Sequence, residues 1–219
     1  MQLNFSVGKC FFQPSSRDTA SPLATVNSNS KSSPSVSAAN NAGLAVELAL
    51  AEGFRVEDLR SLTDETLMWT LQQRYSTHPA IVHLIDCLQT RRLYKPCYML
   101  SIDIGEERRR RMVDRYHENG AERERAEQAL AAAAKLKPHQ VIIYCPSFGM
   151  SLQEADVLVR MEGGKLLRLS DSNNEEIRIL KEKHKALWRF FVLIDRAVWD
   201  KRDRVARAAA EYIGIHSTA

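Results

Sequence analysis

The stretch CYMLSIDI at residues 97–104 decides the fold class of this 219-residue chain. It directly follows Pro96, and its side chains alternate between two faces, which predicts a β-strand. Two apolar runs farther along, Val141–Cys145 and Phe190–Asp195, have the length of short buried strands. The second half of the chain is therefore expected to build a small sheet.

A hairpin and a set of helices complete the expected fold. Asp156–Glu162 and Lys165–Leu169 flank Gly163-Gly164, a pair typical of a hairpin turn. Capping residues such as Thr63 and apolar residues at helical spacing predict the helices. They are expected at Ala45–Phe54, Asp64–Tyr75, Pro79–Thr90, Glu106–His117, Ala121–Leu136, Asn174–Trp188 and Ala197–Tyr212. The class is α+β: a helical segment followed by a small antiparallel sheet with packed helices.

The chain divides into three parts by composition. Residues 1–41 are rich in Ser, Asn, Thr and Pro and are expected to form a disordered arm, because they contain too few large apolar residues to offset their ordering entropy. Residues 42–95 form the helical segment, and residues 96–219 form the α+β lobe. The hydrophobic content of the whole chain, 44%, is enough for a real core.

Composition also narrows the setting and the chemistry. No apolar run approaches the roughly 20 residues of a membrane span, and the first residues lack a secretory signal, so we expect a cytoplasmic protein with no membrane contact. The net charge of +4 suits phosphate but does not require it. Cys10, Cys87, Cys97 and Cys145 form no Cys-x-x-Cys pair, which argues against zinc and disulfides and favours free, buried thiols.

Five segments, taken in order, point to a known family: LRSLTDETL (59–67), RRLYK (91–95), KPHQVIIYC (137–145), FGM (148–150) and FFVLI (190–194). Together they resemble the region that follows the catalytic core in HD-domain deoxynucleotide triphosphohydrolases. The resemblance covers about Gly43 to Tyr212. It implies the C-terminal α+β lobe of such an enzyme.

The resemblance also implies where the family's chemistry lies. In intact members a histidine, a His-Asp dipeptide and a later aspartate hold a divalent metal, which polarises the phosphate ester and activates the attacking water. No histidine in this sequence is followed by aspartate. We therefore expect a non-catalytic lobe without the HD core, with no catalytic residue, no metal ligand and no cofactor. Either a truncated or separately encoded lobe or a natural disordered arm would explain residues 1–41.

The family's R-x-L-[FY]-K element supplies cations to a regulatory triphosphate, and Arg91, Leu93, Tyr94 and Lys95 match it. The resemblance thus implies that Arg91 and Lys95 contact a nucleotide phosphate. A favourable helix dipole would explain basic residues at this helix end without any ligand. The expected partners are an HD catalytic core or a second copy of the chain, and a nucleotide.

Other functional classes receive less support. Arg108–Arg111 could contact nucleic acid, but on a helix these side chains point in four directions, with Glu106 and Glu107 within ion-pair reach. A freestanding module that binds protein or nucleic acid remains the alternative. His78 and His83 are five residues apart, off the spacing at which two helical histidines share one ion, and no P-loop or nucleophile elbow is present.

Overall fold

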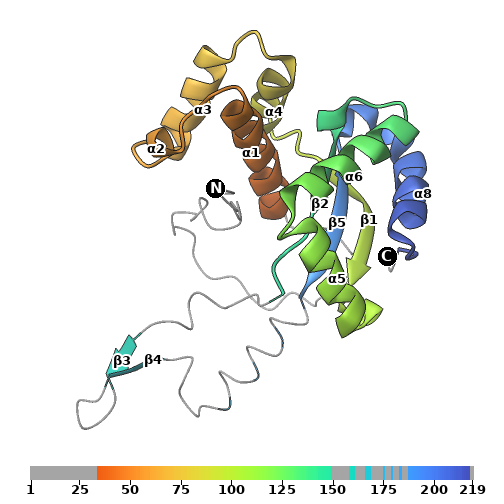
Figure 1. Ribbon diagram of the computed structural model, residues 1–219. Coiled ribbons are helices and arrows are strands. Elements are labelled where there is room, and N and C mark those ends of the chain that lie inside the picture. The colour runs from red at the N-terminus through yellow and green to blue at the C-terminus, as the bar shows by residue number, and fades with distance from the viewer. Residues whose placement is uncertain are drawn as a thin grey trace, which may run out of the picture.

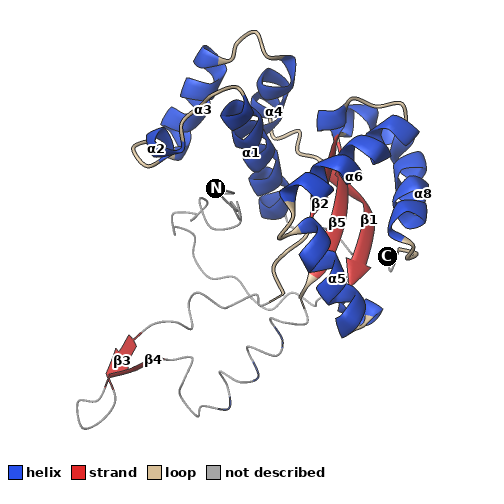
Figure 2. Ribbon diagram, viewed as in Figure 1, coloured by secondary structure: helices blue, strands red, loops and turns tan. Residues whose placement is uncertain are grey.

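The computed structural model describes residues 34–148, 158–160, 166–168 and 187–217, and the single residues 175, 179 and 183. The described part begins with a helical segment and continues into a mixed part, as Figures 1 and 2 show. The helical segment contains α1 (Pro34–Ala51), α2 (Val56–Leu59), α3 (Asp64–Arg74) and α4 (Pro79–Gln89). The mixed part contains β1 (Lys95–Ser101), η2 (Ile102–Ile104), α5 (Glu106–Tyr116), α6 (Gly120–Ala133), η3 (Pro138–Gln140), β2 (Val141–Tyr144), β3 (Leu158–Arg160), β4 (Leu166–Arg168), β5 (Arg189–Ile194), η6 (Arg196–Lys201) and α8 (Arg202–Ile213), where η marks a 3-10 helix.

The main sheet has the order β1-β5-β2, and both pairings are antiparallel. The last strand of the chain therefore lies at the centre. Leu100 is opposite Phe190 in one pairing, and Ile143 is opposite Val192 in the other. The register shifts around Cys97, which leaves a bulge in β1 next to Pro96, as expected for a proline on an edge strand. The predicted α+β class with a small antiparallel sheet is confirmed.

Alternate residues of β5 enter two different cores. Phe190, Val192 and Ile194 lie in a first core, packed against buried side chains of α5, α6 and α8. Phe191 and Leu193 lie in a second core with α1, α3 and α4. Figure 1 shows α6 and α8 on one side of the three strands and α1 on the other. Because helices cover both faces, β5 is apolar from Phe190 to Ile194 rather than alternating with polar residues.

Local signals place the helices of the first half. Thr63 caps α3, since its side-chain oxygen accepts a hydrogen bond from the backbone N–H of Thr66 at 3.4 Å. His78 caps α4 through Nδ1, which accepts from Ile81 N at 3.3 Å, and Pro79 occupies the first helical position. The predicted helices at 64–75 and 79–90 are thus confirmed to within one residue at each end.

The expected boundary between a disordered arm and the folded part, at residue 41, lies too far along the chain. Helix α1 begins at Pro34, so residues 34–41 belong to a helix and not to the expected disordered arm. Ala45 and Ala49 on the same helix are fully buried in the second core, and this packing stabilises the preceding turns as well, although the composition of those turns is polar. Residues 1–33 of the predicted arm lie outside the described residues.

Two other elements differ from expectation. The strand expected at 97–104 ends at Ser101, whose hydroxyl accepts from Asp103 N at 3.3 Å and starts η2. Trp188 does not end a helix; it is buried in the first core, and its indole N–H donates to Pro146 O at 3.3 Å. Of the helix expected at 174–188, residues 175, 179 and 183 are helical as predicted, and most of the others lie outside the described residues.

The predicted hairpin is confirmed as the antiparallel pair β3–β4, although its Gly163-Gly164 turn is outside the described residues. No helix in the described part of the chain combines the length and apolar character that a membrane span requires.

Candidate functional site

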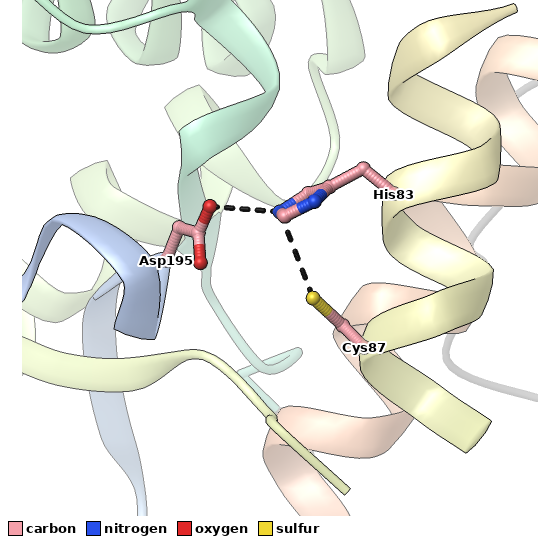
Figure 3. A group of neighbouring side chains, drawn as sticks. All are labelled: His83, Cys87 and Asp195. Atoms are coloured by element: carbon pink, nitrogen blue, oxygen red, sulfur yellow. Dashed lines mark hydrogen bonds and ion pairs between the residues drawn. The ribbon is translucent and has the colours of Figure 1, made fainter. Parts of the chain in front are cut away.

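Three side chains that can bind metal converge where α4 meets the end of β5. His83 and Cys87 lie one turn apart on α4, and Asp195 directly follows the central strand. Figure 3 shows the three side chains pointing toward one another. His83 Nε2 is 2.8 Å from Asp195 Oδ2 and 3.6 Å from Cys87 Sγ, and the three ligand atoms all lie within 4.8 Å of one another.

The fold holds these groups in place from both sides. Residues four apart on a helix share one face, so His83 and Cys87 both face the end of the sheet. Cys87 is only 2% exposed within the second core, whereas the side chain of His83 is 32% exposed. The group thus has a buried inner side and a solvent-facing outer side.

Asp195 is the most constrained of the three residues. It is 1% exposed, and its Oδ1 accepts from Ala197 N at 2.9 Å, which caps η6. Its Oδ2 accepts from Gln140 Nε2 at 3.3 Å, and its own N–H donates to Gln140 O at 2.9 Å. A buried carboxylate with this many donors keeps its orientation without a ligand.

Burial sets the protonation of the neighbouring groups. Burial, and secondarily the charges of Asp195 and Asp86, raises the pKa of the Cys87 thiol to about 11. Burial also lowers the pKa of His139, with further lowering from His83; the two rings lie 5.7 Å apart between centroids. At neutral pH Cys87 is therefore a thiol and His139 a neutral imidazole.

The geometry argues against a nucleophilic triad. In such a triad the carboxylate binds one imidazole nitrogen and the nucleophile binds the other. Here both Asp195 Oδ2 and Cys87 Sγ approach the same nitrogen, Nε2 of His83. The three groups converge on one point, which suits either a shared ion or a structural hydrogen-bond cluster.

Arg91 follows α4 in a strained backbone conformation. Its φ of 54° is in the left-handed region, which bulky residues adopt at a cost of about 1–2 kcal/mol. The N–H of Arg91 donates to Leu88 O, and the N–H of Arg92 donates to Cys87 O, which together form a Schellman motif. The side chain of Arg91 is exposed, whereas Arg92 forms an ion pair with Asp86.

Lys95 lies four residues after Arg91, at the start of β1. It is exposed, and its ammonium lies 5.5 Å from the ring centroid of Trp199. Between the two cations, Tyr94 is 1% exposed and donates from its hydroxyl to His139 O at 2.8 Å. The connection that carries both cations is thus anchored to the core.

The model of a family described as HD associated region matches residues 40–219 of this chain. The chain belongs to that family. The match confirms the resemblance to a region associated with HD-domain proteins and extends over the helical segment and the sheet together. Neither the curated proteins nor the solved structures that were compared gave a match.

In this HD associated region, the arginine run 108–111 has acidic neighbours on the same helix. Arg110 pairs with Glu106 at 3.3 Å and Arg111 with Glu107 at 3.4 Å, each one turn back. These are the ion pairs expected for a solvated helix. They pair two of the four arginines of the run with acidic neighbours.

The sequence did not predict the convergent group, which consists of His83, Cys87 and Asp195. Part of its signal is nevertheless local. The readable signal is a histidine and a cysteine one helical turn apart, His83 and Cys87. The spacing of His78 and His83 and the lack of a Cys-x-x-Cys pair both point away from a metal site. Asp195 is 112 residues from His83 and gives no local signal. The thiols of Cys87, Cys97 and Cys145 are free, as predicted, and Cys10 is outside the described residues.

Proposed function

We propose that this HD associated region is a non-catalytic lobe of an HD-type phosphohydrolase. In this proposal it packs against the HD core, forms contacts between subunits, and presents Arg91 and Lys95 to the triphosphate of a regulatory nucleotide. The parent activity would be metal-dependent hydrolysis of deoxynucleoside triphosphates. The family match supports the association with HD-domain proteins.

The described residues give no support for the family's metal site in this chain. No histidine is followed by aspartate in the sequence. Among the described residues, the one grouping of His, Cys, Asp or Glu atoms close enough to share an ion includes a cysteine and a single histidine. This set does not fit the histidine-aspartate cluster of the HD core and gives no support to a hydrolytic step at this point of the fold.

The observation that carries the nucleotide role is the anchored connection from Arg91 to Lys95. A guanidinium can hold two phosphate oxygens in a fork, and an ammonium adds a point charge. Tyr94, buried between them, fixes the backbone on which both cations stand.

The test compares Arg91 with Lys135, a second exposed basic residue in the same backbone conformation, with φ of 56°. Arg91→Gly and Lys135→Gly each remove one cation and the same strain. We expect Arg91→Gly to weaken binding of a fluorescent deoxynucleoside triphosphate about 10- to 100-fold, because each charge-assisted hydrogen bond contributes about 1.5–3 kcal/mol. Lys135→Gly should leave the affinity unchanged.

Two results would contradict this proposal. Equal weakening by both substitutions, or no binding by the full chain at millimolar nucleotide, would remove the phosphate role from Arg91. Turnover of deoxynucleoside triphosphates by the pure chain, abolished by a chelator, would show that the lobe is catalytic.

A further inference from the structure

The ligand atoms of the convergent group at the end of β5 lie close to the spacing of a metal site, all within 4.8 Å of one another. Around a tetrahedral zinc, with bonds of about 2.3 Å to sulfur and about 2.0–2.2 Å to nitrogen and oxygen, ligand atoms lie about 3.4–3.6 Å apart. Cys87 Sγ and His83 Nε2 are already 3.6 Å apart. The 2.8 Å between His83 Nε2 and Asp195 Oδ2 would need to open by about half an ångström, within the reach of small side-chain rotations.

The ligand types select the ion. Zinc binding releases the proton of the Cys87 thiol to solvent, so that the ligand is a thiolate. Thiolate and imidazole are ligands of zinc and other borderline or soft metals, whereas magnesium and calcium prefer oxygen alone. Two ligands come from adjacent turns of α4, and the third comes from a segment more than one hundred residues away in sequence. This combination of a short helical spacing and a distant third ligand is common in zinc sites.

We infer that His83, Cys87 and Asp195 bind a zinc ion that ties α4 to the end of the central strand. Sequence spacing led us to expect no metal ligand in this chain, but that expectation considered only pairs close together in the sequence. The inference goes beyond the proposed function and does not depend on the nucleotide role of Arg91 and Lys95.

The surroundings of the group match those of known zinc sites. Gln140 and the N–H of Ala197 hold the carboxylate of Asp195, as outer hydrogen bonds orient ligands in metal sites. The three protein ligands leave a fourth position on the partly exposed side of His83, where water completes the tetrahedron. Zinc at this point would couple the helical segment to the sheet, because its ligands come from both.

The experiment measures metal on the full chain, purified without chelators. We expect about one zinc per chain by elemental analysis, and cobalt substitution should give a sulfur-to-cobalt charge-transfer band in the near ultraviolet. Cys87→Ser should abolish the band and weaken zinc binding, measured against a chromophoric chelator, by at least about 10-fold, the lower end of what ligand-shell changes cost. His83→Gln, at a partly exposed position, should weaken zinc binding similarly without risk to the core.

The matched control is Cys97→Ser, which changes a partly buried thiol whose Sγ donates to Val192 O. It should leave both zinc content and the cobalt band unchanged, and so should Arg91→Gly, which separates this site from the nucleotide proposal. The inference is overturned if the folded chain takes up no zinc from excess, or if zinc affinity survives both Cys87→Ser and His83→Gln.

Discussion

Two basic residues in this molecule occupy positions that usually hold glycine. Arg91 and Lys135 each directly follow the C-cap residue of a helix and have a left-handed backbone. Each closes a Schellman motif. For Lys135, the N–H donates to Ala132 O at 3.0 Å and the next N–H, of Leu136, donates to Ala131 O at 2.8 Å. The favourable helix dipole offsets only part of the conformational cost.

Replacing Lys135 with glycine should therefore stabilise the chain. We expect Lys135→Gly to raise the free energy of unfolding by about 1 kcal/mol, because glycine adopts positive φ without a steric penalty. Urea denaturation of the variant and the wild type measures the difference. A lower midpoint for the variant would mean that the lysine side chain contributes more than its backbone conformation costs.

The carboxyl group of Glu127 is buried at the edge of the sheet. Its Oε1 accepts from Ile143 N at 2.8 Å, which satisfies a backbone donor on edge strand β2. Burial raises the pKa of Glu127 to about 8, with Glu47 and Glu124 adding to the increase and Arg123 opposing it. The folded protein therefore binds this proton more tightly than the unfolded chain does.

Stability should consequently fall as pH rises through the interval between the unfolded and folded pKa values of Glu127, about 4.5 to 8. Below this interval both states hold the proton, and above it neither does. Glu127→Gln keeps an oxygen acceptor for Ile143 N but cannot titrate, so its contribution to the slope should vanish. Denaturation midpoints of both proteins across this interval provide the measurement, and parallel pH profiles would refute the assignment.

At the scale of elements, the central strand β5 contributes most to the core. Phe190 is fully buried, and its ring contacts those of Tyr98 and Tyr116, with centroids 6.4 Å and 5.7 Å away. Phe190→Ala should cost about 3–5 kcal/mol, because the large cavity left behind cannot collapse between packed layers. Trp69→Ala on α3 is the control: that ring is 65% exposed, and the loss should be below about 0.5 kcal/mol. Comparable losses in thermal or urea denaturation would contradict the assigned core.

The elements that could be predicted from sequence are those with local signals. Thr63 and Pro79 fixed the starts of two helices, and Asn119-Gly120 fixed the break before α6, where the side chain of Asn119 accepts from Glu122 N. Strand order could not be predicted, because β5 pairs with strands roughly fifty and ninety residues earlier, and no local pattern encodes such pairing. The convergent group could not be predicted for the same reason. The spacing of His83 and Cys87 on one helix can be recognised in the sequence, but the approach of Asp195 cannot.

At the scale of the whole molecule, the boundary expected near residue 95 does not separate two cores. The helical segment packs on one face of the sheet, so residues on both sides of this boundary build the second core, including Ile81 before it and Leu193 after it. A partly buried ion pair between Glu47 of α1 and Arg123 of α6, 2.6 Å long, adds a further link. Neither part can expose its sheet-facing surface without removing contacts from the other.

This shared strand predicts one cooperative unfolding transition for the described fold. Amide hydrogens in α4 and in α8 should exchange with the same free energy of opening, because each helix is released only when β5 loses its neighbours. Native-state hydrogen exchange resolves the two helices, and Leu193→Ala, which perturbs only the second core directly, should lower protection in both by similar amounts. If α4 opened at a markedly lower free energy than α8, the helical segment would be an independent unit that docks onto a preformed sheet, and the two cores would not be coupled through β5.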